Sequence, residues 1–168
     1  MEFNNISHPS EALMGELIKE AWYEEEGILA AVIDPQGNII AKGGTTIWTD
    51  HDPTAHAEIN AIRAACKALQ TDKLPGHWLY STFEPCPLCA SAIIWAGFEG
   101  VVYANNPDYR GKQDNWSFIK CRDVLKAGSY IHEVELIEDF LLDEMKDYFL
   151  VGWGQHRAFW LNRQNASN

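Results

Sequence analysis

The sequence predicts an α/β domain with three layers, α/β/α, in which helices cover both faces of a mixed sheet of roughly five strands. First, apolar runs typical of strands alternate along the chain with segments that carry apolar residues at helical spacing. Second, a short turn joins the first two strands, so they pair antiparallel, while helix-length segments between later strands allow parallel pairing. Third, 168 residues, 46% of them hydrophobic, suffice for one core. Residues 1–168 are therefore expected to form a single domain.

The first helix and the hairpin after it are located by their boundary residues. Ser10 is a good helix N-cap, and the helix it opens ends at residues 24–27. Its apolar stripe consists of Leu13, Leu17 and Ala21. Residues 28–33 are an uninterrupted apolar strand, residues 34–38 form a turn rich in Pro, Gly and Asn, and Ile39 begins the returning strand.

A second helix is expected after a loop that spans residues 45–52. Asp52 is predicted to cap this helix, with Pro53 at the first helical position, where a missing N–H costs nothing. Apolar residues then follow at helical spacing, namely Ile59, Ile62, Cys66 and Leu69.

A strand over residues 78–83 leads to a third helix. Cys86 is the expected cap of this helix, and Pro87 is its expected first residue. Trp95, near the end of the same helix, is expected to lie in the core. Residues 101–104 then form another strand.

The last third of the chain is less regular. Residues 105–115 are polar and read as a loop, and residues 131–137 include the last predicted strand. Glu138 and Asp139 are predicted to open a final helix.

Two short segments suggest metal chemistry: His-Ala-Glu at residues 56–58 and Pro-Cys-Pro-Leu-Cys at residues 85–89. Cys86 and Cys89 are three residues apart at a predicted helix start, so both sulfurs lie on one face and can reach one metal ion. Together with His56 they make a set of one imidazole and two thiolates, which suits tetrahedral zinc. Three protein ligands leave the fourth position open, which is the pattern of catalytic rather than structural zinc.

Glu58 is the candidate proton carrier beside this metal. On an ideal helix, however, Glu58 lies about 200° around the axis from His56. Spacing alone therefore does not prove that the two side chains converge, and without the neighbouring motif a solvated helix glutamate would be the favoured interpretation.

The composition limits which binding partners and which cell compartment are expected. The net charge is −11, with 13 basic and 24 acidic residues, which disfavours nucleic acid because its binding depends on basic side chains. No apolar segment approaches the length of a membrane span, and no targeting signal is visible, so a cytoplasmic protein is expected. Four cysteines then favour metal or thiol chemistry over disulfides.

The strings Asp-Pro-Thr-Ala-His-Ala-Glu (52–58) and Phe-Glu-Pro-Cys-Pro-Leu-Cys (83–89) resemble the cytidine deaminase superfamily, in its guanine deaminase and tRNA adenosine deaminase branch. Residues 61–69 and 92–96 are similar to the guanine deaminase group. The resemblance implies a zinc-dependent hydrolytic deaminase that releases ammonia from a nucleobase-like small molecule, guanine first.

The resemblance also implies roles for individual residues. His56, Cys86 and Cys89 would bind Zn²⁺, and Glu58 would shuttle the proton. The backbone near Ala57 would contact the base. Asp114 would be an acidic substrate contact from the C-terminal half.

A homodimer is a further implication of the resemblance. The C-terminal segment, residues 150–168, would pack on the partner subunit, with Phe159 and Trp160 closing the partner's site.

One residue departs from the pattern of this branch. Thr45 stands where an Asn usually contacts the purine, and a hydroxyl cannot reproduce the paired contact of an amide. The alternatives to guanine deamination are an adenosine deaminase acting on tRNA or nucleosides, and a non-catalytic deaminase-like zinc subunit. A thiol-redox protein is disfavoured because it leaves residues 56–58 unexplained.

Overall fold

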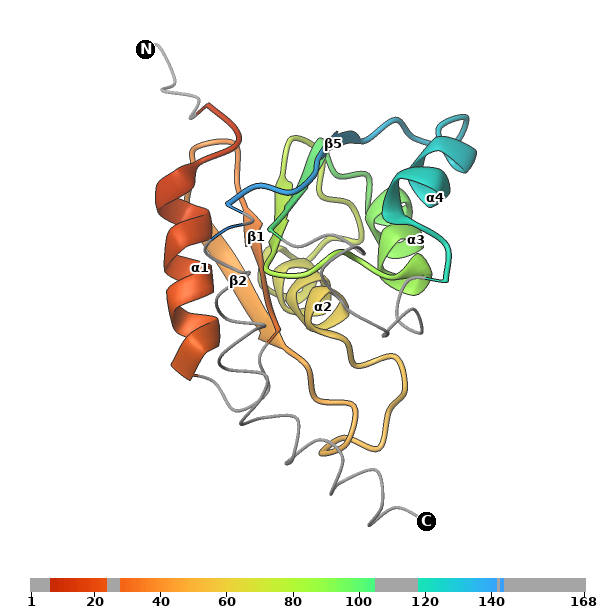
Figure 1. Cartoon of the computed structure of the whole chain (residues 1–168). Helices are drawn as coiled ribbons and strands as arrows, with labels where there is room; N and C mark the ends of the chain where they lie inside the picture. Colours follow the sequence, from red (N-terminus) through yellow and green to blue (C-terminus); the bar gives the residue numbers. More distant parts are fainter. Residues whose placement is uncertain (1–6, 24–27, 105–117, 142, 144–168) are drawn as a thin grey trace.

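The structure is a computed structural model that describes residues 7–23, 28–104, 118–141 and 143 (Figure 1). Along the chain the elements are α1 (Glu11–Tyr23), β1 (Leu29–Ile33), β2 (Ile39–Gly44), α2 (Ala57–Leu69), β3 (Trp78–Ser81), α3 (Pro87–Ala96), β4 (Gly100–Tyr103), α4 (Cys121–Ala127) and β5 (Glu135–Ile137). No helix among the described residues is long and apolar enough to span a membrane.

The five strands form one mixed sheet in the order β2-β1-β3-β4-β5. Strand β1 pairs antiparallel with both β2 and β3, whereas β3 pairs parallel with β4 and β4 parallel with β5. Strands β2 and β3 therefore run in the same direction, and their carboxyl ends lie at the same edge of the sheet. Helices α2 and α3 follow these two strands, so both begin at that edge.

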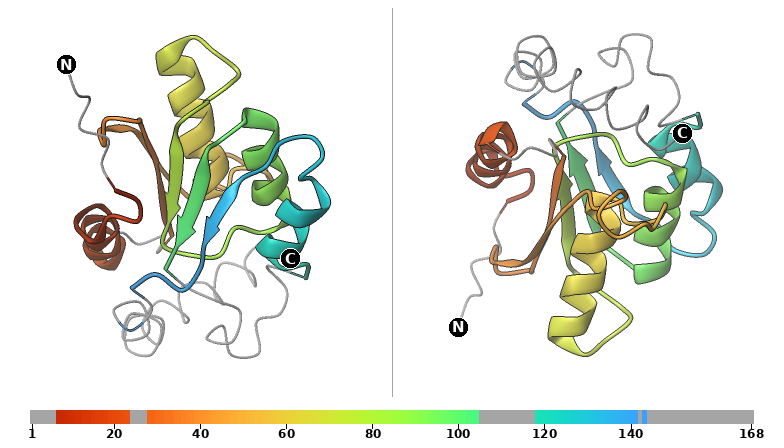
Figure 2. Two further views of the ribbon diagram at one scale, coloured as in Figure 1. Left: turned by 90° about the horizontal axis from the view of Figure 1, so that it is seen from above. Right: turned by 90° about the horizontal axis from the view of Figure 1, so that it is seen from below.

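Helices cover both faces of the sheet, which confirms the predicted α/β/α layers (Figure 2). Helix α1 packs on one face through Met14, Leu17, Ile18 and Ala21. Helices α2, α3 and α4 pack on the other face. Side chains alternate along β1 accordingly, so that Leu29, Ala31 and Ile33 face α1 while Ala30 and Val32 face the other helices.

Helix α2 lies unusually close to the end of β2. A Cβ atom added to Gly43 would come within 3.0 Å of backbone atoms of Ala57, Asn60 and Ala61. Only glycine allows this approach. The first turn of α2 is thereby held against the segment that leads into residue 45.

The start of α2 corrects the sequence prediction. The helix begins at Ala57, with His56 as N-cap, rather than at Pro53. The Asp52 carboxylate instead accepts hydrogen bonds from the backbone N–H and the hydroxyl of Thr54. The Asp52 carboxylate therefore stabilises a local turn. Aspartate is favoured both in such turns and at helix N-caps, so the residue type alone does not distinguish the two.

The predicted final helix does not begin at Glu138. Asp139 and Leu141 have φ angles of 58° and 53°, in the left-handed region, and residues 139–141 form a bend and turn. The rest of the predicted helix falls mostly on residues outside the described part of the chain. The short helix α4 (Cys121–Ala127) was not predicted, because only Cys121 and Leu125 are buried in it.

Trp95 was wrongly predicted to lie in the core, since 63% of its surface is exposed. Its neighbours on α3 that are buried are Cys89, Ala90, Ile93, Ile94 and Ala96. The helix is apolar on almost all sides, so its hydrophobic pattern did not reveal which side faces solvent.

Candidate active site

The site is built on the first residues of α2 and α3. His56 is the N-cap of α2 and Cys86 is the N-cap of α3, and both have extended backbone conformations. Neither side chain makes a cap hydrogen bond to its own helix. Pro87 occupies the first turn of α3 as predicted, and Cys89 follows one turn after Cys86. Both helices present their N-termini at the same edge of the sheet.

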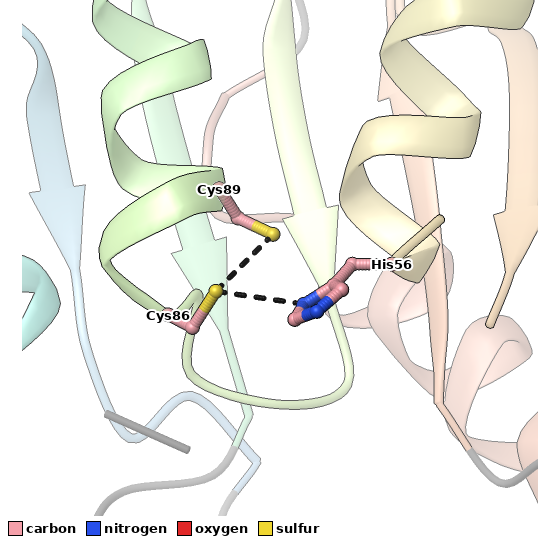
Figure 3. A group of neighbouring side chains, drawn as sticks. All are labelled: His56, Cys86 and Cys89. Carbon is pink, nitrogen blue, oxygen red and sulfur yellow. Dashed lines mark hydrogen bonds between the residues drawn. The ribbon is translucent and has the colours of Figure 1, made fainter. Parts of the chain in front are cut away.

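His56, Cys86 and Cys89 point toward one another across the gap between the two helices (Figure 3). The Cys86 Sγ atom lies 3.5 Å from His56 Nδ1 and 3.6 Å from Cys89 Sγ. All three ligand atoms lie within 4.8 Å of one another. Tetrahedral zinc with Zn–S near 2.3 Å and Zn–N near 2.0 Å requires ligand separations of about 3.5–3.8 Å. The separations at Cys86 fit this requirement.

The two thiols differ in acidity. Hydrogen bonding with Cys89, assisted by His56, lowers the pKa of Cys86 to about 4. The same sulfur–sulfur contact and burial raise the pKa of Cys89. The pair therefore favours one thiolate and one thiol. A cation between the sulfurs would stabilise both thiolates and displace the remaining proton.

Glu58 lies beside this group with 4% of its surface exposed. Its Oε2 atom is 3.4 Å from Cys89 Sγ, and its Oε1 atom accepts a hydrogen bond of 3.0 Å from Ser81 Oγ. Burial raises the pKa of Glu58, and the nearby charge of Cys86 adds to this shift.

The angle of about 200° expected between His56 and Glu58 assumes that both residues are helical, and in the structure only Glu58 is. His56 is the extended cap residue and Glu58 is the second helical residue, so the 200° separation of an ideal helix is absent. This local geometry allows both side chains to face the same point.

A small pocket opens over the group. It is lined by Ile28, Thr45, His56, Glu58, Phe83, Glu84 and Cys86. Thr45 is thus brought to the site, whereas Ala57 is fully buried and is absent from the lining side chains. Asp114, together with Phe159, Trp160 and the rest of residues 150–168, lies outside the described residues.

Asn60 is a residue that sequence reasoning missed. Its Nδ2 atom donates to the Gly44 carbonyl and to Thr46 Oγ1, each at 2.8 Å. These two partners flank Thr45 in the chain, so Asn60 fixes the segment that carries Thr45 into the pocket. The signal for this role was a polar amide in the first turns of a helix whose neighbours are apolar.

Glu84 is a second residue that was missed. It is 3% exposed and lines the pocket, and its Oε1 atom accepts a hydrogen bond of 2.9 Å from the backbone N–H of Cys121. The carboxylate thereby connects the segment before Cys86 to the start of α4. No pattern in the sequence predicts this contact, because residues 84 and 121 are far apart along the chain.

Comparison with known proteins identifies the family. Residues 8–105 match the family model described as "Cytidine and deoxycytidylate deaminase zinc-binding region". The chain is 50% identical over 78 residues to a guanine deaminase of Bacillus subtilis, a match that covers 46% of this chain and 50% of that protein. It is 35% identical over 137 residues to a tRNA-specific adenosine deaminase of the same organism, covering 80% and 82%.

The fold is similar to that of a solved structure. A guanine deaminase from Nitrosomonas europaea superposes with a TM-score of 0.72 at 24% identity, covering 84% of this chain and 82% of that one. The match to the Bacillus guanine deaminase spans only about half of that protein's length. The family model, by contrast, covers more than half of this chain and includes residues 56–58 and 86–89. The chain belongs to the cytidine and deoxycytidylate deaminase family, whose members bind zinc.

Proposed function

We propose that this protein catalyses the zinc-dependent hydrolytic deamination of a small aminated nucleobase or related heterocycle, guanine first, with release of ammonia. One observation carries the proposal: the Oε2 atom of the buried Glu58 lies 3.4 Å from Cys89 Sγ, and Glu58 lines a pocket together with His56 and Cys86. A purely structural metal site has no use for such a carboxyl group.

In this proposal His56, Cys86 and Cys89 hold the zinc ion. The separations between their ligand atoms and the low pKa of Cys86, about 4, both suit a divalent cation. A zinc ion held by these three residues would supply an activated water for attack on the amino-bearing ring carbon.

Glu58 carries the proton. Its Oε2 atom faces the metal ligands and is placed to accept a proton there and to deliver it to a ring nitrogen or to the leaving amine. A group that must both accept and donate works best when its pKa lies near the operating pH. The burial of Glu58 shifts its pKa from the usual carboxyl range in this direction.

Charge favours a small base over tRNA as the substrate. The net charge is −11, and the residues lining the pocket in the described part of the chain include Glu58 and Glu84 but no Lys or Arg. A phosphate backbone would therefore find no cationic partner among these lining residues. The guanine deaminase relative is also more identical to this chain than the tRNA-specific relative, although over a shorter segment.

Thr45 and Asp114 are the proposed substrate contacts that distinguish bases. Thr45 lines the pocket and has only one hydroxyl to offer. Thr45→Asn is expected to change the ratio of kcat/KM between guanine and other aminopurines. An unchanged ratio would remove Thr45 from this role. Asp114→Ala is expected to raise KM for the preferred base.

We also propose a homodimer that forms through α3 and α4. A groove between these helices is lined largely by apolar side chains, among them Ile94, the exposed Trp95 and Ile119. Pro87 also lines this groove and directly follows Cys86, so a second copy bound there would reach the edge of the site. Light scattering is expected to give a dimer for the unaltered protein and a monomer for Trp95→Glu. A monomer at all concentrations would contradict the proposal.

The decisive experiment is ammonia release from the zinc-loaded protein with a panel of substrates. The panel contains guanine, other aminopurines, aminopterins, triazines, cytosine, adenosine and a tRNA transcript. Release from guanine is expected to be fastest. Release only from the tRNA would favour the adenosine deaminase alternative, and no release from any compound would favour a non-catalytic zinc subunit.

A further inference from the structure

We propose that Ser81 is a positioning residue for Glu58. Its hydroxyl holds one carboxyl oxygen of Glu58, so that the other oxygen stays directed at the metal ligands. This inference rests on the proposed role of Glu58 as proton carrier, and the experiments below separate the two.

The direction of the Ser81 hydrogen bond follows from its neighbours. Ser81 is the last residue of β3 and is fully buried. The backbone N–H of Phe83 donates to Ser81 Oγ at 3.3 Å, so one acceptor position of the hydroxyl is occupied. Glu58 Oε1 lies 3.0 Å from the same Oγ atom. A serine hydroxyl has a single proton, which is therefore directed at Glu58.

The two oxygens of Glu58 consequently have different surroundings. Oε1 is held by Ser81, and Oε2 lies 3.4 Å from Cys89 Sγ, on the side of the metal ligands. The terminal torsion of a glutamate is broad and has no single preferred value. A donor at one oxygen restricts that torsion, and proton transfer is sensitive to displacements of about 1 Å. Ser81 thus determines which oxygen is available for the reaction.

The neighbouring hydroxyl provides a matched comparison. Thr82 is also fully buried, but its Oγ1 atom accepts from the Leu29 N–H at 3.1 Å and donates to the Leu29 carbonyl at 3.3 Å. Its hydrogen bonds therefore join two backbone segments. If a buried hydroxyl at this edge served stability alone, removing either one would have the same kind of effect.

The first experiment compares steady-state kinetics of Ser81→Ala and Thr82→Val after the zinc content of each has been measured. Ser81→Ala is expected to keep zinc and to lose about tenfold to a hundredfold in kcat, with KM changed by less than about threefold. Ser81→Thr keeps the hydroxyl and is expected to restore most of the turnover. Thr82→Val is expected to lower the melting temperature while kcat per zinc-loaded molecule is retained.

A second variant guards against a packing artefact. Ser81→Cys keeps the approximate size of the side chain but is a weak donor, and it is expected to lose turnover as Ser81→Ala does. Zinc-loaded Ser81→Ala that turns over like the unaltered protein would overturn the proposal.

A double-variant cycle tests whether Ser81 acts through Glu58. The Ser81→Ala change is expected to have no further effect on kcat in a Glu58→Gln background, because the group that it positions is already inactive. Equal losses in both backgrounds would overturn the proposal.

Crystal structures give a readout that does not depend on activity. The Glu58 carboxyl group is expected to rotate in zinc-loaded Ser81→Ala but not in Thr82→Val, and an unmoved carboxyl would overturn the role of Ser81. If the unaltered protein deaminates none of the tested compounds, the proposed function fails, and these structures still decide whether Ser81 positions Glu58.

Discussion

The two faces of the sheet differ in what they bury. Against α1 the buried side chains are almost entirely apolar, from Met14 and Leu17 on the helix to Ala31 and Ile33 on β1. On the opposite face, four of the five buried polar or charged residues in the described part of the chain line the pocket or contact Glu58. These four are Thr45, Glu58, Ser81 and Glu84.

Under the proposed function, one face of the sheet contributes mainly to stability and the other carries the reacting groups. Burying a carboxyl group without partners is costly, so the four polar residues persist only where other polar groups meet them. That condition holds where α2 and α3 begin, because helix N-termini and strand ends supply N–H donors. On the α1 face the described buried side chains pack as an apolar cluster instead. Changes on the two faces should therefore separate turnover from stability.

The largest effect is expected from removing a metal ligand. Cys86→Ala should lose the zinc, from about one ion per chain to almost none, together with all measurable turnover. Its melting temperature should also fall. Metal analysis measures the zinc content, and an ammonia-release assay measures the turnover. Cys66→Ala is the matched control, since Cys66 is a free cysteine outside the metal-binding group. A zinc-loaded Cys86→Ala would show that the ligand assignment is wrong.

Glu58→Gln should separate metal binding from catalysis on the same face. The amide keeps the size of the side chain but cannot carry the proton, so kcat should fall by about a hundredfold to ten-thousandfold. Zinc content should stay unchanged, and the melting temperature should not fall, because a buried acidic group is replaced by a neutral one. Turnover within a few fold of the unaltered protein would exclude Glu58 as proton carrier.

Leu17→Ala should have the opposite profile on the α1 face. Leu17 is 1% exposed and packs in the apolar cluster of that face. Truncation should lower the free energy of unfolding by about 2–5 kcal/mol. Below the new melting temperature, kcat per folded, zinc-loaded molecule should be unchanged. Urea unfolding measures the free energy of unfolding, and steady-state kinetics measure kcat. A large loss of kcat at full zinc loading would contradict the view that the α1 face affects stability alone.

The smallest effect is expected at His8, which also lies on the α1 face. Its ring stacks on the Trp78 ring, with 4.4 Å between the ring centroids, and its Nδ1 atom is 2.8 Å from the Tyr80 hydroxyl oxygen. Burial lowers the pKa of His8 below its usual value of 6.5, so the folded state binds the proton less readily than the unfolded state. The stability that neutral His8 contributes is complete above pH 6.5 and is lost as the pH falls from there toward the folded pKa.

His8→Phe keeps an aromatic ring on Trp78 without a titrating group. The denaturant midpoint of this variant should change less between pH 7.5 and 5.5 than that of the unaltered protein. Equal pH dependence in both proteins would contradict the assignment to His8. Turnover should be the same in both.

Local patterns explain what sequence reasoning predicted correctly. The apolar strands, the turn before Ile39, the cap at Cys86 and Pro87 in the first turn of α3 depend on neighbouring residues. The spacing of Cys86 and Cys89 is likewise local. The same kind of reasoning failed at Asp52, where a turn to Thr54 competes with helix capping, and at Trp95, where an all-apolar helix conceals its exposed side.

The sequence by itself determined the mixed α/β/α architecture and the residue types of the metal-binding group. Only the tertiary structure decided that these residues meet. Glu58 is separated from Ser81 by 23 residues and from Cys89 by 31, and the contacts form because β2 and β3 end at the same edge of the sheet. No local pattern encodes such an arrangement, because it depends on the order of the strands in the sheet. For the same reason the supporting role of Ser81 was visible only after the fold was known.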